Sequence, residues 1–433
     1  MATQSVDFTP SESTAMRTRS FLGEGVLLVF CLLTLGVLEP ELSSVNFRDK
    51  TLQLVIDDGA ANLANQLQWL ALASVATLAI SRQFGRLWSL VLAAWPLMLV
   101  LVYCLLSAVW SDYPDISVRR CFGLIIPAYC LMAAIAVVDR PERIAKILYL
   151  AFWAALICNL LALSLPSAYD EVEFFRGVTS NKNILGGLGA LAILSGVAIS
   201  PLINGIWSRT LLLLYVAGWS YLLIVSVSKT SIALTLCVPI LICALSWVSM
   251  GLRTSVASLA GILATVLLTI TGVSYAVLGT TLADVVYLAW DDATFTGRTQ
   301  IWNFMLDEIG ENWITGIGFG SFWGVGGSSP NLYAGLDYIR LINQAHNGYL
   351  DLLATVGVLG IILVIVMLAQ VLRKTEKFRV TQRWQFRFVW FIVAFSIIHN
   401  AMESSLLVPF SIVWHLTLLA YVVGVWSAQQ AAS

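Results

Sequence analysis

The strongest constraint on this chain is a succession of long apolar segments. A helix that crosses the hydrocarbon core of a bilayer needs about 20 mostly apolar residues, and such segments recur along most of the 433-residue sequence. About twelve of them predict an all-α polytopic membrane protein. We predict spans at 21–38, 62–81, 87–109, 121–138, 144–165, 184–204, 209–227, 230–249, 253–279, 347–372, 385–400 and 404–427.

The composition agrees with a chain whose main solvent is lipid. Apolar residues make up 59% of the sequence and charged residues 11%, which leaves too few polar side chains to cover a soluble protein. The net charge of -1 gives no indication of nucleic-acid binding. The seven cysteines lie in or beside apolar segments without metal-ligand or disulfide-like spacing, so we interpret them as packing residues. No small-residue cleavage site follows the first apolar segment, so we predict that this segment is a retained helix rather than a removable signal.

The basic residues between the spans predict the orientation of the chain. With the polar N-terminus 1–20 in the cytoplasm, alternate loops carry the clusters of Arg and Lys, as the positive-inside rule requires. The densest cluster, 373–387, follows the tenth span. We therefore expect four further regions: spans one to nine in 21–279, a large extracytoplasmic loop in 280–345, spans ten to twelve in 346–428, and a cytoplasmic tail in 429–433.

That large loop holds the most unusual sequence. Residues 297–309 have apolar side chains at helical spacing, which predicts an amphipathic helix on the membrane surface with Arg298 in its first turn. The glycine-rich segment 316–327 indicates a flexible stretch where backbones approach closely. It resembles a dinucleotide fingerprint only superficially, because no strand precedes it and no helix opens directly after it.

Two basic residues on the outer side have both a functional and a structural interpretation. Lys229 separates two apolar segments with almost no loop, so we expect its ammonium to lie at the bilayer edge. A charge there either has a partner or a function in the protein, or it extends to the lipid phosphates. Arg176 opens a polar stretch that runs into a glycine-rich helix. The alternative there is interfacial capping, with Asn183 or Ser180 as the N-cap.

The remaining candidates lie in and after the large loop. Arg298 is either functional or a solvated charge on the surface helix. His346 begins the tenth span, where a histidine is either a catalyst or a cap or interface residue. His399, Asn400 and Glu403 lie in the last outer turn and either surround His346 or form the polar hinge of a helical hairpin.

Four segments together resemble the signature of the O-antigen ligase and exopolysaccharide polymerase superfamily. They occur in that family's order and cover about the C-terminal two-thirds of the chain. The stretch 179–186 and the Ser-Lys-Thr-Ser form are most similar to the succinoglycan-type polymerases. The segments are 175–186, Ser228-Lys229-Thr230-Ser231, 296–302, and 346–350 with Gly357 and Gly360.

The resemblance implies a fold of the membrane glycosyltransferase class GT-C. It also implies transfer of a glycan from an undecaprenyl-diphosphate carrier to an acceptor hydroxyl on the periplasmic side of a Gram-negative inner membrane. The implied reaction is metal-independent and inverting, and it needs no cofactor. Polymerisation of exopolysaccharide or O-antigen repeat units is favoured, and ligation to lipid A-core is the alternative.

The resemblance also assigns roles and partners. It carries the family's essential arginines onto Arg176 and Arg298 and its essential histidine onto His346. Lys229 stands where the ligases usually have arginine, and lysine binds phosphate as a point charge rather than with a bidentate fork. The implied partners are the lipid-linked glycan, a glycan or lipid A-core acceptor and membrane lipids, with no nucleic acid. Whether a chain-length regulator binds stays open.

The residue types suit this chemistry. A diphosphate leaving group carries away its own negative charge, so the site needs cations rather than a general acid, and Arg176, Lys229 and Arg298 supply three. His346 is suited to act as the base on the acceptor hydroxyl. We expect these residues to support the site: Asn183, Asn347, Tyr349, His399 and Glu403.

Two other groups of residues have simpler interpretations. The acidic pairs Asp57-Asp58 and Asp291-Asp292 are interpreted as solvated loop residues rather than a metal site. For most of the loop aromatics, anchoring in the headgroups is favoured over stacking on sugar rings. These aromatics are Trp302, Trp313, Trp323 and Tyr333.

A transporter or flippase for the same lipid-linked sugar is the competing class. Carriers place ionisable groups near the bilayer midplane at broken helices, and they contain internal repeats. These spans are almost free of charge and show no convincing repeat. The charges gather at one outer surface instead, which favours a transferase.

We predict that segment 280–345 lies in the periplasm, because the basic segment 373–387 lies one span later. A phosphatase reporter, which is active only outside the cytoplasm, should be active when fused within 280–345. The same reporter fused within 373–387 should be inactive. Activity of the second fusion alone would reverse the predicted orientation.

Overall fold

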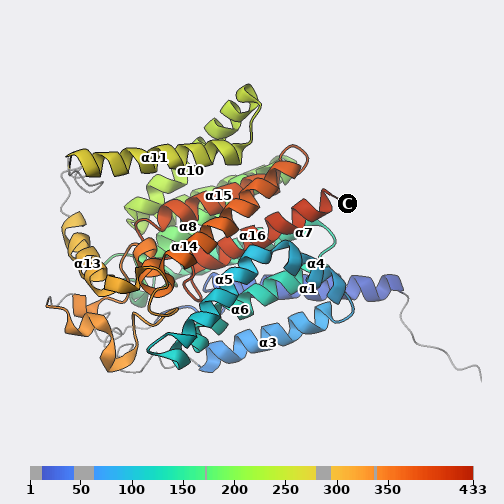
Figure 1. The fold of residues 1–433 in the computed structure, drawn as a ribbon. Coiled ribbons are helices and arrows are strands. Elements are labelled where there is room, and N and C mark those ends of the chain that lie inside the picture. Colours follow the sequence, from blue (N-terminus) through green and yellow to red (C-terminus); the bar gives the residue numbers. More distant parts are fainter. Residues whose placement is uncertain (1–11, 43–62, 171–172, 279–293, 336–338, 433) are drawn as a thin grey trace, which may run out of the picture.

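The computed structural model describes residues 12–42, 63–170, 173–278, 294–335 and 339–432. Within these ranges the regular structure is helical, apart from an isolated bridge between Tyr169 and Phe175. Most long helices run side by side as a bundle, and α13 and its loop lie at one end (Figure 1). The α-helices are α1 (Glu12–Thr34), α3 (Leu63–Ile80), α4 (Phe84–Ala93), α5 (Trp95–Leu106), α6 (Pro114–Val137), α7 (Pro141–Ala162), α8 (Lys182–Ile199), α9 (Ile206–Val225), α10 (Lys229–Leu252), α11 (Val256–Leu278), α13 (Thr294–Ile309), α14 (Gly348–Thr375), α15 (Arg383–His399) and α16 (Ile412–Gln430).

The lengths of these helices confirm a polytopic membrane protein. In the described ranges, nine helices are long and apolar enough to cross a bilayer: α3, α6, α7, α8, α9, α10, α11, α14 and α16. The pair α4 and α5 passes the same criterion as a broken span, bent by 82°. The apolar part of α1 is Ser20–Thr34, and α15 has 17 residues.

Some boundaries differ from the predicted ones. The predicted span 87–109 is bent at Ala94, because Pro96 occupies the first turn of α5, a position that proline favours and from which it starts a new helix. The last span begins at Ile412 rather than 404, since the Asn400 side chain accepts from two turn amides instead. Residues 1–11, 280–293 and both predicted acidic pairs lie outside the described residues.

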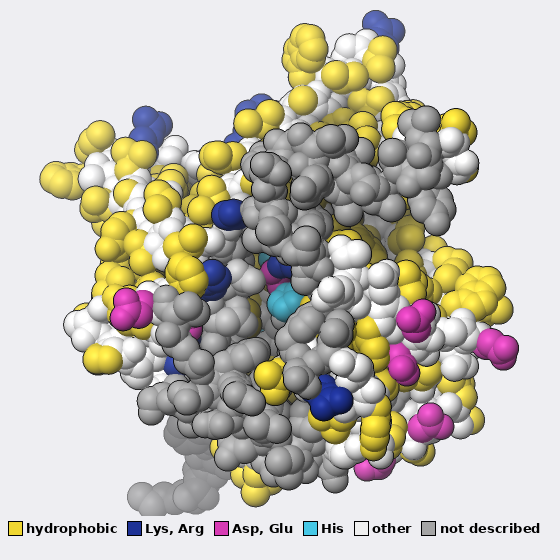
Figure 2. Space-filling model, turned by 90° about the vertical axis from the view of Figure 1, so that its left-hand side faces the viewer, with side chains coloured by type: hydrophobic (Ala, Val, Ile, Leu, Met, Phe, Trp, Pro, Cys, Tyr) yellow, Lys and Arg dark blue, Asp and Glu magenta, His cyan; other side chains and the backbone are white. Residues whose placement is uncertain are grey.

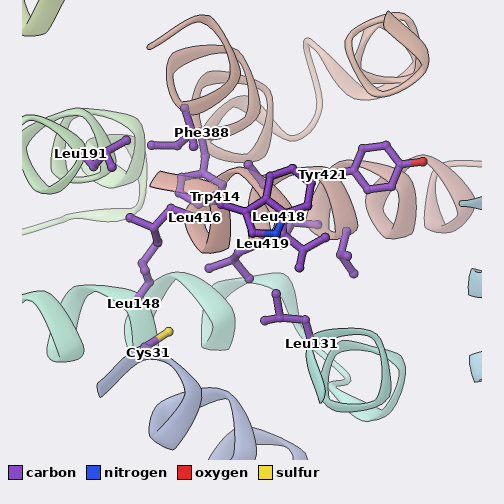
Figure 3. Packing of buried hydrophobic residues seen from close by; sticks show 14 of the residues in the cluster. Cys31, Leu131, Leu148, Leu191, Phe388, Trp414, Leu416, Leu418, Leu419 and Tyr421 are labelled. Carbon is purple, nitrogen blue, oxygen red and sulfur yellow. The ribbon is translucent and has the colours of Figure 1, made fainter. Parts of the chain in front are cut away.

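Helix α16 forms the centre of the bundle. Its apolar window is 94% buried inside the protein, whereas that of α11, along one edge, is only 6% buried. Figure 3 shows Trp414 and its neighbours on α16 surrounded by side chains of α6, α7, α8 and α15. This core fixes α8 and α15, whose outer ends carry candidate site residues.

Helix α14 is broken at Gly357, where φ is 64° and ψ is -173°. The break removes main-chain partners from the carbonyls before it, and in a bilayer each unsatisfied group costs several kcal/mol. The glycine-rich loop and Tyr103 supply the missing donors. Two loop amides donate to α14: Ile317 N to Ala354 O (2.9 Å) and Gly318 N to Thr355 O (3.0 Å). The hydroxyl of Tyr103 donates to Val356 O (3.1 Å). In the opposite direction, Leu359 N of α14 donates to Ile314 O of the loop (3.2 Å).

Helix α13 and the loop after it form a second, smaller core. The apolar face of α13 is buried in this core, so it contacts protein, and the position of the helix relative to the membrane surface stays a prediction. A lone amphipathic pattern does not distinguish a lipid surface from a protein surface. The helix begins at Thr294, so Arg298 lies beyond its first turn. The core consists of Ile301, Met305, Ile309, Phe322, Ala334, Ile339, Ala345 and Ala354.

Replacing Gly357 with alanine should destabilise the fold. Its backbone conformation is open essentially only to glycine, and an added Cβ would collide with the carbonyl of Ile314. We expect a loss of about 3 kcal/mol in unfolding free energy, seen as a lower thermal midpoint in detergent.

Gly261→Ala in α11 is the matched control. An added Cβ there meets nothing within 4 Å, so this variant should match the parent or gain up to about 1 kcal/mol. Equal midpoints for the two variants would contradict the role assigned to the break.

Candidate functional site

The buried carboxylate of Glu403 joins four separate elements at one end of the bundle. Glu403 lies in the turn between α15 and α16 and is 9% exposed. Its Oε1 accepts from Nδ2 of Asn183 at 2.9 Å and from Nη2 of Arg298 at 3.2 Å. Its Oε2 lies 3.1 Å from Nδ1 of His346. Residues from α8, α13, the start of α14 and the last outer turn therefore meet at one group.

The electrostatics of this cluster keep Glu403 ionised. Burial raises the pKa of the carboxyl, but the hydrogen bond and charge of His346 and the charges of Arg298 and His399 lower it, and the net pKa lies below the ordinary value. Arg298 also donates from Nη1 to the carbonyl of Met402 at 3.0 Å. The guanidinium is thus held by two contacts, one to the carboxylate and one to the neighbouring main-chain carbonyl.

Glu403 also sets the orientation of His346. A carboxylate facing Nδ1 favours the tautomer that carries its proton there, which leaves Nε2 as the basic nitrogen. His346 has a left-handed φ of 49°, and its side chain is 28% exposed. Figure 2 shows a histidine side chain at the surface of this end, with basic and acidic side chains beside it. Such an imidazole is able to take a proton from a group that arrives from outside.

The start of α14 is held by two of the predicted supporting residues. Asn347 is the N-cap, and its Oδ1 accepts from the amides of Tyr349 at 3.1 Å and Leu350 at 3.4 Å. Tyr349 donates from its hydroxyl to the carbonyl of Ile397 in α15 at 2.8 Å. These contacts hold the helix start that follows His346, and the supporting roles of Asn347 and Tyr349 stay predictions.

His399 lies behind the cluster rather than in it. Its Nδ1 is 2.9 Å from Oγ of Ser405, and its ring stacks on Phe395 with the centroids 5.0 Å apart. Asn400 is also buried, and its carbonyl accepts from the amide of Gly348 at 2.8 Å. This turn therefore packs against the start of α14 beside the Glu403 cluster.

Arg176 lies apart from the Glu403 cluster and has its own acceptors. Its buried guanidinium donates to the carbonyls of Glu41 and Thr179, both at 2.9 Å, and of Ser167 at 2.7 Å. Burial lowers the pKa of Arg176 and the charge of Asp170 opposes this, but a guanidinium stays protonated. The contacts tie the segment after α1 to the segment before α8.

A short hydrogen-bonded path connects Arg176 to the cluster. Thr179, which accepts from Arg176, donates from Oγ1 to the carbonyl of Asn181 at 3.0 Å. Asn181 is the N-cap of α8, so the prediction of Asn183 or Ser180 as the cap was wrong. The reason is geometric, because the Asn183 side chain is used by Glu403.

Lys229 begins α10 and is exposed. The residue before it, Ser228, packs so closely on Gly186 of α8 that a Cβ on that glycine would collide with it. The start of α10 therefore lies against the first turns of α8, the helix that carries Asn183. This places Lys229 on the same side of the bundle as the cluster.

Asp351 is a functional candidate that the sequence interpretation missed. It lies in the first turns of α14 and accepts from Nε1 of Trp323 at 2.7 Å, from the amide of Ala345 at 3.2 Å and from Oγ of Ser404. It thereby holds the residues next to His346 and Glu403. A carboxylate just inside an apolar span was the available signal.

Arg120 of α6 is the second missed residue. Its guanidinium donates to the carbonyls of Trp323 and Gly324, both at 2.7 Å, and to that of Gly320. The glycine-rich loop therefore folds around a cation, which explains the close approach predicted there.

The loop aromatics divide into two groups. Trp302 donates from Nε1 to the carbonyl of Ala345 at 3.1 Å, and Trp323 packs edge-on against Phe322. These two rings are used inside the loop and beside the site. Trp313 and Tyr333 are exposed, so headgroup anchoring stays a prediction for them.

Comparison with known proteins identifies a related region. Residues 184–365 match the O-antigen ligase family model. The exopolysaccharide production protein ExoQ of Rhizobium meliloti (strain 1021) is 24% identical over 277 residues, which are 62% of this chain and 62% of that protein. The matched chain thus spans less than two thirds of that relative. The family match includes Lys229, Arg298 and His346, while Arg176 and Glu403 lie outside it.

Removing the charge of Glu403 should reduce stability in a pH-dependent way. Because its folded pKa is lowered, its stabilisation is present above the ordinary carboxyl pKa and is lost as the pH falls through the folded value. Glu403→Gln should therefore lose about 2 kcal/mol at neutral pH. The gap in thermal midpoint should narrow on acidification to about pH 4.

Glu308→Gln removes an exposed carboxylate from α13 and serves as the control. Its thermal midpoint should follow that of the parent at both pH values. A gap between Glu403→Gln and the parent that stays the same across the range would contradict the ionised cluster.

Proposed function

Taking residues 184–365 as a region of the O-antigen ligase family, we propose that this multi-pass membrane protein transfers a glycan from an undecaprenyl-diphosphate carrier to an acceptor hydroxyl. The reaction takes place at the periplasmic face of the bacterial inner membrane. Its product is a longer exopolysaccharide or O-antigen chain built from repeat units. The observation that carries this proposal is the Glu403 cluster, which holds a histidine base and an arginine within reach of one carboxylate.

His346 acts on the acceptor. Its Nε2 takes the proton as the acceptor oxygen attacks the anomeric carbon of the donor sugar. Glu403 stabilises the imidazolium that forms, as the aspartate of a hydrolase triad does. The bond between the anomeric carbon and the diphosphate oxygen breaks with inversion, and the diphosphate leaves with the electron pair. The proton on His346 then passes to solvent.

The cations act on the donor. Two contacts position the Arg298 guanidinium, which has further N–H groups to offer to diphosphate oxygens. Lys229 adds a point charge from the start of α10. Arg176 is the third cation, and because three carbonyls occupy its guanidinium, it acts through its charge and by placing residues 176–183. These cations replace a metal ion, so turnover should persist in EDTA.

Two other functions give different products. Similarity to an exopolysaccharide production protein favours a polymerase over a ligase that joins finished chains to lipid A-core. Deleting a polymerase gene leaves single repeat units attached at the surface, whereas deleting a ligase gene leaves free long chains. Deleting a flippase gene traps single units inside the cell. Sizing and locating the glycan of a deletion strain separates all three.

Single substitutions should divide the site into its two halves. Loss of a charge-assisted contact costs about 1.5–3 kcal/mol, so Lys229→Ala and Arg298→Ala should each slow polymer formation roughly tenfold to more than a hundredfold. Lys229→Arg should retain part of the activity, and Arg298→Lys should lose more because a point charge replaces the fork. His346→Ala should abolish transfer while carrier binding stays nearly intact, measured with labelled carrier and purified protein.

Arg209→Ala, which removes an exposed cation from the first turn of α9, is the matched control and should make normal polymer. Arg176→Ala should also lower the amount of folded protein, since three carbonyls lose their donor. The amount of each variant in the membrane is measured in parallel. Normal polymer from the alanine variants at Arg176, Lys229 and Arg298 would contradict the assignment of the cations.

A further inference from the structure

An open cavity of about 360 Å³ lies at the end of α14 opposite His346. From the break at Gly357 to its end at Thr375, α14 rises by roughly 27 Å. The cavity therefore lies well away from the candidate transfer site. Its lining consists of Trp95 of α5 together with Val366, Gln370, Arg373, Lys374 and Lys377.

The inner wall of this cavity is built by fixed contacts. The carbonyl of Ala93, at the bend between α4 and α5, accepts from Nε2 of Gln370 at 3.1 Å and from Nζ of Lys374 at 2.8 Å. Gln370 in turn accepts from the hydroxyl of Tyr421 in α16 at 2.7 Å. The position of Lys374 is thus set by the protein before any ligand arrives.

The cavity has positive charge without a matching carboxylate. Arg373 and Lys377 are exposed, and neither forms an ion pair with a residue in the described ranges. The carboxylate of neighbouring Glu376 bonds the amide of Val256 at 2.8 Å and lies 3.7 Å from Arg379. Three cations that share one cavity repel each other, so an anion bound between them is favoured.

The surroundings place this charge at a membrane interface. Helix α4 is bent by 82° from α5, so it runs nearly perpendicular to α5 at this end of the bundle. Its exposed side chains Phe84, Trp88 and Leu92 recur every four residues and form an apolar stripe. Trp95, on the cavity wall, is 50% exposed. Tryptophan side chains are enriched at the headgroup level of membranes, which fits both Trp88 and Trp95.

An apolar surface also leads from the cavity toward the middle of the bundle. Leu99 and Val102 on α5 and Leu359 and Ile362 on α14 are exposed, and α5 packs against α14. Leu99 and Val102 follow Trp95 along α5, and Ile362 and Leu359 precede Val366 along α14, so both pairs lie progressively farther from the cavity. A ligand with an anionic head and long apolar chains uses both the cations and this surface, whereas a free phosphate uses only the cations.

We propose that this cavity binds the phosphate-bearing headgroup of an anionic phospholipid, with its acyl chains along α5 and α14. The headgroup bridges the bend at Ala94 and the C-terminal end of α14. It thereby holds the interfacial helix α4 against the bundle at the face opposite the transfer site.

Lipid binding to the purified full-length chain tests this proposal directly. Phosphatidylglycerol is titrated into the detergent-solubilised protein, and bound lipid is measured by native mass spectrometry. Each cation near such a surface contributes roughly a fivefold change in affinity, so the double variant Arg373→Gln with Lys377→Gln should bind about 25-fold more weakly. Both side chains are exposed, and normal gel filtration and thermal midpoints verify that the variant folds.

The control variant Arg209→Gln with Arg383→Gln removes two exposed cations from the same end of the bundle and should bind phosphatidylglycerol like the parent. Phosphatidylcholine should bind both proteins weakly, and inorganic phosphate should not compete at equal concentration. An equal loss in the two double variants would show non-specific attraction and overturn the proposal. Competition by inorganic phosphate as strong as by lipid would overturn the choice of a lipid.

Discussion

The end of the bundle that carries the candidate site depends on one buried carboxylate. An ion removed from water is costly unless hydrogen-bond donors satisfy it, and at Glu403 the donors come from Asn183, Arg298 and His346. Each donor belongs to a different part of the chain. The same contacts therefore hold these parts of the chain together and set the geometry of the proposed site.

A second requirement comes from the bilayer itself. A helix broken within it must find new partners for its freed main-chain groups, and α14 finds them in a segment that sequence distance places far outside the span. Arg120 closes the same segment by donating to three of its carbonyls. The loop is consequently docked on the spanning helix by main-chain contacts, and its apolar residues form a core of their own against α14.

Local sequence patterns predicted much of this arrangement. Apolar length and helical period depend on neighbouring residues, so nine of the predicted spans, in the part of the chain that the structure describes, and the helix containing Arg298 were found without a structure. The sequence left the position of Glu403 open between a place beside His346 and a polar hinge, and the structure places its carboxylate against His346. The structure adds the contact itself, and the proposed catalytic roles stay predictions.

What the sequence did not predict depends on partners distant along the chain. The buried face of α13 faces protein because the loop folds over it, and an amphipathic pattern is the same for either environment. The acceptors of Arg176 are main-chain carbonyls, which every residue type possesses and no motif marks. Asp351 was missed for a similar reason, since its partners lie in three other segments.

The way in which the loop is docked on α14 has an evolutionary consequence. The three bonds between the loop and the break use only amide and carbonyl groups. They require glycine where the two backbones approach closely, but no particular side chain at the bonded residues. Exposed side chains of the loop, such as that of Tyr333, are then open to sequence drift while the register on α14 persists. A loop docked in this way can change its outer surface and leave the scaffold beneath unchanged.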